Sequence, residues 1–88
     1  MIEVIQQSDH RVIRLAGRLA EAQVPQLFEV CGPQTTGVEL DLGDLISVDA
    51  VGLDALDRLR QGGAAFVEVP EYIQLKLKAL STRRRSSG

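Results

Sequence analysis

Apolar and acidic residues alternate between Val38 and Leu42, in the segment V-E-L-D-L. Successive side chains of a strand point to opposite faces, so Val38, Leu40 and Leu42 share one face, and Glu39 and Asp41 share the other. The pattern predicts a central strand with one face in the core. Further strands are predicted at Ile2–Ile5, at Arg11–Ala16 (which Gly17 is expected to stop) and at Ala65–Val69.

Three other segments favour helices. Apolar residues recur at i, i+3, i+4 and i+7 from Val24, and proline is tolerated only in a first turn. We therefore expect a regular helix that begins at Val24 or Pro25 and ends before Gly32. Its apolar face consists of Val24, Leu27, Phe28 and Cys31. A second helix is predicted over Ala50–Gln61, ended by two glycines, and a third over Glu71–Leu80.

The predicted order is strand–strand–helix–strand–helix–strand–helix. A hairpin followed by alternating helices and strands indicates an α/β fold with a mixed sheet. A chain of 88 residues has room for one domain, which we place at residues 1–80. Residues 81–88 lack apolar side chains and include three arginines, so they are expected to form a disordered basic tail.

Asp49 stands where the N-cap of the second helix belongs, because its carboxylate can accept hydrogen bonds from the first-turn amides. Gly52 follows in that turn, although glycine costs a helix about 1 kcal/mol relative to alanine. Either a neighbouring strand or a partner is therefore expected to approach the backbone at Gly52 closely, and we favour the neighbouring strand. Asp54 and Arg58 predict an i, i+4 ion pair on the outer face of the helix, where Asp57 is also expected to be exposed.

The segment from Val38 to Leu56 resembles the signature of STAS domains, the anti-sigma-factor-antagonist family. In that signature a strand ends in D-L, and after a short loop D-S-S-G-L or D-S-T-G-L opens a helix; here the helix opens with D-A-V-G-L from Asp49. Ile13–Leu19 is similar to the family's second strand with its L-x-G-x-L ending, and Gly62–Val69 is similar to its G-x-x-x-x-V strand. The resemblance implies a STAS-like α/β fold over nearly the whole chain. Many members continue into another strand and helix, so it also implies a C-terminally short form.

In the family, a partner kinase phosphorylates the hydroxyl residue directly after the aspartate. Ala50 and Val51 occupy this region here, and neither can carry a phosphoryl group. The resemblance therefore implies a non-enzymatic regulatory module that binds an anti-sigma factor or another kinase-like protein and is not switched at this site. The implied docking surface lies on Ser47–Leu59 and includes Ser47, Asp49, Gly52, Asp54 and Asp57. For Asp49, plain helix capping is the structural alternative, and both roles can hold at once.

A second reading also follows from the resemblance. Short STAS domains serve as cytosolic accessory subunits of lipid-exporting ABC transporters, where they dock on the ATPase. Those subunits commonly have a threonine after the aspartate, which this chain lacks at Ala50. A transporter in the same operon, rather than a kinase or sigma factor, would favour this alternative.

Catalytic and metal-binding residues are sparse. His10 is the one histidine, and it falls in a predicted hairpin turn away from Cys31, so the sequence assembles no nucleophile–base pair. A metal site or a phospho-accepting aspartate could be sought in the acidic run of Asp41, Asp44, Asp49, Asp54 and Asp57. A receiver-type site needs a further acidic pair on the first strand, which offers only Glu3. We expect no enzyme, metal or cofactor.

Charge and composition argue against a nucleic-acid partner and bear on the location and self-association of the protein. The net charge is −2, and the three arginines at 83–85 leave residues 1–80 at −5, without the basic, aromatic stripe of a nucleic-acid binder. A lone cysteine on an apolar helical face is expected to be a buried hydrophobe. Without a signal peptide or a membrane-length apolar run, a cytoplasmic protein is expected. The sheet edge at Ala65–Val69 can be bare, covered or paired with another chain. Because the domain is small, we expect either this edge or the apolar ends of the third helix to be covered in a two-fold homodimer.

Overall fold

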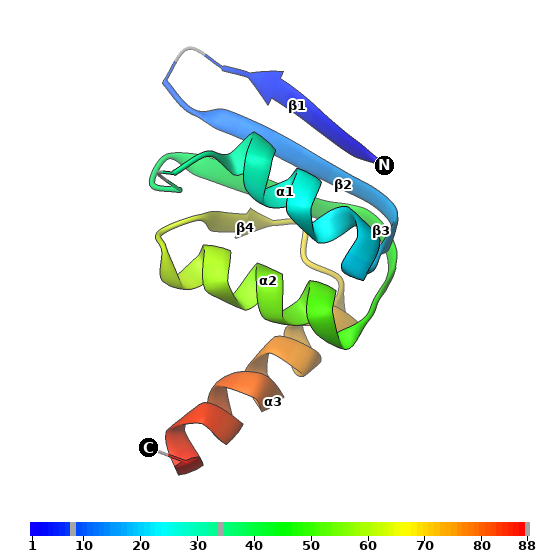
Figure 1. The fold of residues 1–88 in the computed structure, drawn as a ribbon, viewed down its shortest axis with the longest axis vertical. Coiled ribbons are helices and arrows are strands. Elements are labelled where there is room, and N and C mark those ends of the chain that lie inside the picture. Colours follow the sequence, from blue (N-terminus) through cyan, green and yellow to red (C-terminus); the bar gives the residue numbers. More distant parts are fainter. Residues whose placement is uncertain (8, 34, 88) are drawn as a thin grey trace.

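A four-stranded mixed sheet organises the chain (Figure 1). The computed structural model describes residues 1–7, 9–33 and 35–87, and side chains only as far as residue 80. Strand β1 (Ile2–Gln6) pairs antiparallel with β2 (Arg11–Leu19), which pairs parallel with β3 (Val38–Val48). Strand β4 (Ala65–Val67) pairs parallel with β3. The strands lie in the spatial order β1-β2-β3-β4, and the predicted mixed sheet and order of elements along the chain are confirmed.

Helices α1 (Val24–Cys31) and α2 (Ala50–Gln61) lie side by side over one face of this sheet (Figure 1). A 3₁₀ turn, η1 (Glu21–Gln23), leads into α1, and Pro25 lies in the first turn of α1 as expected. Gly32 ends α1 with a φ of 75°, which a residue without a Cβ adopts readily. The aliphatic core lies between this face and the helices: Ile13, Leu15, Leu19, Leu27, Cys31, Val38, Leu40, Leu42, Leu45, Leu56, Leu59, Ala64, Ile73 and Leu77.

Both central strands are longer than predicted. Gly17 does not stop β2: with a φ of 78° it lies where the pairing with β3 shifts register, and β2 resumes as far as Leu19. A separate register shift between Arg14 and Ala16 comes before it, and Asp44 of β3 pairs with Ala16 after that shift, so β3 also continues past Leu42. Each strand therefore continues through a point where its alternation of apolar and polar residues is interrupted. It continues because the neighbouring strand supplies hydrogen-bond partners before and after the interruption.

Helix α3 (Glu71–Ser87) extends beyond the predicted end at Leu80 and projects away from the sheet (Figure 1). Ile73 and Leu77 on its first half are buried in the core. The hydroxyl of Tyr72 donates a hydrogen bond to the Leu45 carbonyl at 2.8 Å, which anchors the start of α3 to β3. Side chains 81–88 lie outside the described part of the chain, so the division into a domain at 1–80 and a basic tail stays a prediction.

Candidate functional site

Asp49 joins the end of β3 to the start of α2 and holds two helical segments at once. Its Oδ1 accepts a hydrogen bond from the Gly52 amide at 2.7 Å, which confirms the predicted N-cap. Its Oδ2 accepts from the Glu21 amide at 3.0 Å, at the start of η1. These amides, Gly52 first, hold the pKa of the Asp49 carboxyl below its usual value. The side chain is therefore an exposed carboxylate at neutral pH.

Gly52 is buried against β2, as the sequence predicted. A Cβ at this position would lie 2.6 Å from the Leu19 carbonyl oxygen and 2.9 Å from a Val48 methyl group. The same Leu19 carbonyl accepts a hydrogen bond from the Asp49 amide at 3.1 Å. The close approach of strand to helix start requires glycine here. Gly52 thus shapes the site from within and offers no side chain to a partner.

The two residues at the start of α2 are both accessible. Ala50 is exposed, and Val51 is 42% exposed. Val51 borders a shallow groove of about 210 Å³ between α1 and α2, which Val24, Phe28, Asp54, Ala55 and Arg58 also line. Phe28 was assigned to the core face of α1, but it is 37% exposed in this groove. The i, i+3, i+4, i+7 spacing places Phe28 on the apolar face of α1. It does not show whether the side chain lies in the core or at the margin of the contact between α1 and α2.

The two acidic residues further along α2 differ from each other. Asp54 is partly exposed and pairs with Arg58 at 2.9 Å, as predicted. The expectation that Asp57 is exposed is wrong, because its side chain is 1% exposed and accepts hydrogen bonds from Arg60 and Gln61, both at 2.6 Å. Asp57 follows Leu53 by one turn, and Leu53 lines a groove with residues of α3. Packing of α3 on this side of α2 was not visible in the helical pattern.

The end of β3 adds an apolar residue that sequence reasoning missed. Ile46 is 78% exposed, although it lies in a strand next to the buried Leu45. Ser47 is half-buried and lies opposite Arg18 of β2, so it belongs to the sheet and not to the predicted loop. The candidate site therefore consists of Ile46, Ser47 and Asp49 at the strand end, with Ala50, Val51, Phe28 and Asp54 beside them on the helices. The sequence signal that could have revealed the longer strand and its exposed apolar residue was an isoleucine at position 46, within the predicted loop.

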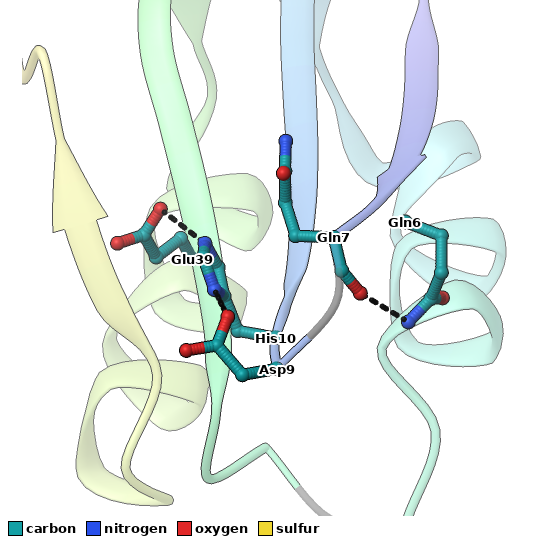
Figure 2. Close-up of polar contacts among 5 residues, drawn as sticks. All are labelled: Gln6, Gln7, Asp9, His10 and Glu39. Atoms are coloured by element: carbon teal, nitrogen blue, oxygen red, sulfur yellow. Dashed lines mark hydrogen bonds and ion pairs between the residues drawn. The ribbon is translucent and has the colours of Figure 1, made fainter.

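His10 lies at the opposite end of the sheet, between two carboxylates (Figure 2). Its Nδ1 is 2.7 Å from Asp9 and its Nε2 is 3.4 Å from Glu39 of β3. The hydrogen bond to Asp9 is the largest cause that raises the pKa of His10, and Glu39 adds to it. The two carboxylates thus favour the protonated, positively charged form of His10 over the neutral form that a general base requires.

Cys31 and His10 line one open pocket of about 590 Å³, contrary to the expected separation. Cys31 is nevertheless 1% exposed, and burial raises the pKa of its thiol, which disfavours the nucleophilic thiolate. It packs in the core as the sequence predicted. Within residues 1–7, 9–33 and 35–87, no three histidine, cysteine or acidic side chains gather closely enough to hold a metal ion.

No protein-family model matches the sequence, and no curated protein matches it. Solved structures do. The unphosphorylated anti-sigma factor antagonist SpoIIAA superposes with a TM-score of 0.63 at 18% identity, over 100% of this chain and 99% of that one. An uncharacterised DUF3478 protein from Shewanella loihica PV-4 with a SpoIIAA-like fold gives 0.55 at 12% identity, over 91% and 75%.

A third similar structure is that of Mglu, with a TM-score of 0.61 at 23% identity. The match covers 78% of this chain but only 19% of Mglu, so the chain corresponds to a small part of that protein. The likenesses to SpoIIAA and to the DUF3478 protein establish a STAS-like fold of the SpoIIAA type, as the sequence predicted. Among the helices of the described residues, none has both the length and the apolarity to cross a membrane.

Proposed function

We propose that this chain is a non-enzymatic protein-interaction module of the anti-sigma-factor-antagonist type, acting in the cytoplasm. Its docking surface consists of the end of β3, the start of α2 and the adjoining face of α1. The observation that carries the proposal is the Asp49 carboxylate, which fixes an exposed helix start beside an apolar groove. The SpoIIAA-like fold supports a protein-interaction module in general.

The shape of this surface suits a protein partner. Val51 and Phe28 leave apolar area open at the groove, and Ile46 leaves more at the strand end. Interfaces commonly place a few apolar anchors inside a polar rim. The groove, at about 210 Å³, is too small for most cofactors but admits one apolar side chain of a partner.

The charge of the surface selects the partner's chemistry. Glu21 is exposed on η1, where its backbone amide donates to the exposed Asp49 carboxylate, and neither η1 nor α1 carries a basic residue. Asp54 is neutralised by Arg58. The surface is therefore acidic around an apolar centre, and it favours a partner that presents an apolar side chain among basic ones.

Phosphorylation at the start of α2 is not part of the proposed mechanism. Ala50 and Val51 are accessible but have no hydroxyl group. A kinase could therefore reach both residues, but neither has the hydroxyl oxygen that would accept the phosphoryl group. In this proposal the module is constitutively competent to bind.

Affinity capture on the full chain, followed by titration of the captured protein, tests the proposal. Ala50→Lys introduces a positive charge at the helix start, which opposes the basic side chains of the proposed partner, and should weaken binding about tenfold or more. Ala79→Lys makes the same chemical change at an exposed position of α3 and should leave affinity nearly unchanged. Thermal melts of both variants check folding. Equal affinities of folded wild type and Ala50→Lys would place the docking surface elsewhere, and capture of a transporter ATPase would favour the accessory-subunit alternative.

A further inference from the structure

The outer edge of β1 presents a regular row of backbone groups. Met1 exchanges hydrogen bonds with Ala16 at 2.8 and 2.9 Å, and the Gln7 amide donates to His10 at 2.9 Å. In an antiparallel pair, hydrogen-bonded and non-bonded residues alternate. Glu3 and Ile5 therefore point their backbone groups at β2. The N–H and C=O groups of Ile2, Val4 and Gln6 point away from the sheet.

Among the described residues, nothing pairs with this edge, because β1 is the first strand of the sheet order (Figure 1). Apart from the charge of Glu3, the edge also lacks the devices that usually prevent strand addition. Its sequence, I-E-V-I-Q, contains no proline, lysine or glycine, and its pairing with β2 has no bulge. Such an edge is a template for another strand.

We propose that β1 pairs antiparallel with β1 of a second copy, about a two-fold axis through Val4. The axis makes Val4 face Val4 of the second copy and Ile2 face Gln6 of the second copy. In this register every outward N–H and C=O group of Ile2, Val4 and Gln6 finds a partner. A shift by two residues in either direction leaves one of these residues unpaired, and a shift by one aligns outward groups with inward ones.

The side chains are compatible with this register. Val4 is 45% exposed on the helix-covered side of the sheet, and two copies of it would bury each other at the axis. Glu3 would lie opposite Ile5 of the second copy, so no like charges face each other directly. Glu3 also lies 3.5 Å from Arg14 of its own chain, which moderates its charge.

The other edge of the sheet is a poor alternative, contrary to the sequence-based expectation for Ala65–Val69. Strand β4 spans only Ala65–Val67. It is followed by Glu68 with a positive φ of 54° and then by Pro70, which has no N–H to donate. A strand this short, ended by a backbone reversal, is one of the ways in which proteins protect an edge.

The dimer would be one continuous sheet with the helices of both copies on the same face, since the two-fold axis is perpendicular to the sheet. Helix α2 lies at the β3–β4 side of each copy, away from the axis (Figure 1). The proposed docking surfaces would therefore remain open at the two ends. The dimer proposal does not depend on the proposed function.

Analytical ultracentrifugation and amide hydrogen exchange of the full chain test the proposal together. The mass should rise with concentration from 9.6 kDa towards twice that value. The amides of Ile2, Val4 and Gln6 should become protected in parallel with dimer formation. The amides of Glu3 and Ile5 should be protected at every concentration, because they bond to β2. A monomer throughout, or a dimer with unprotected amides at Ile2, Val4 and Gln6, would overturn the proposal.

Val4→Pro gives a selective variant. It removes an N–H that points away from β2 and has no hydrogen-bond partner among the described residues. Edge strands accept proline at such positions, so dimerisation should be lost while the fold persists. Val4→Thr keeps the N–H and a β-branched side chain, and it should still dimerise. Val4→Lys, which blocks the edge by charge, is the second test if the proline variant does not fold. Dimerisation by a folded Val4→Pro or Val4→Lys protein would contradict the proposed register.

Discussion

The carboxylate of Asp49 accepts a hydrogen bond from the backbone amide of Glu21, 28 residues earlier in the chain, at 3.0 Å. Because the same carboxylate caps α2 through Gly52, the start of η1 and the start of α2 have one common anchor. The positions of the two helices that border the groove are therefore not independent. A partner that displaces one of them must also disturb the other.

The first prediction concerns the pH dependence of this anchor. The pKa of Asp49 is lower in the folded chain than its ordinary value of 3.8. Its contribution to stability is therefore present above about pH 3.8 and is lost as the pH falls through the lower folded value. The melting temperature of Asp49→Asn should lie below that of the wild type at neutral pH, and the difference should shrink in acid. A difference that stays constant from about pH 7 to about pH 2 would contradict the anchor role.

A second prediction concerns Gly52. Replacement by alanine favours the helix by about 1 kcal/mol, but the new Cβ would lie 2.6 Å from a backbone carbonyl oxygen that cannot rotate away. The clash should dominate, and Gly52→Ala should lower the free energy of unfolding by about 1–3 kcal/mol in urea titrations. Val51→Ala, at the exposed neighbouring position, should change it by less than about 0.5 kcal/mol. A stabilised Gly52→Ala protein would mean that the strand moves away readily.

The third prediction separates Asp54 from Asp57. Asp57→Lys places a buried positive charge beside Arg60, so it should destabilise the fold by about 3 kcal/mol or more. Asp54→Lys breaks the partly exposed pair with Arg58 and should cost less than about 1 kcal/mol. Chemical denaturation of the two variants gives the comparison directly. Similar losses for both would contradict the difference in burial.

The fourth prediction tests the absent phosphoacceptor. Wild type incubated with a cognate kinase-type partner and ATP should gain no phosphate by intact-mass analysis, since Ala50 and Val51 have no hydroxyl group. Ala50→Ser supplies an exposed hydroxyl at the helix start and should gain one phosphate under the same conditions. Phosphate on wild-type Ser47 would show a different acceptor and contradict the proposed constitutive module.

Local signals predicted the parts of the structure that local chemistry determines. The cap at Asp49, the bounds of α2 and the glycine at 52 followed from helix-terminus rules. The full lengths of β2 and β3 did not, because Gly17 and the residues after Leu42 read as strand ends on their own. Only the pairing of two irregular stretches, one on each strand, makes both continuous.

The candidate site was predicted in the same uneven way. The strand end and helix start were located correctly in the chain, but the burial of Asp57 and the exposure of Phe28 depend on where α3 and α1 pack. No residue near either position reveals those contacts. The exposure of side chains at the margin of a helix depends on how the helices and the sheet pack together. The sequence pattern of one helix carries no information about that packing.

The hydrogen bond from Tyr72 to Leu45 places an intrinsic fluorophore, the Tyr72 ring, against the end of β3. The sequence has one tyrosine and no tryptophan, so its near-ultraviolet emission comes from this ring, apart from weak phenylalanine signals. The phenol contacts β3 next to the exposed Ile46, and burial raises the pKa of its hydroxyl. Occupation of the strand end by a partner without tryptophan or tyrosine can therefore be followed by intrinsic fluorescence, without a label at the surface under study.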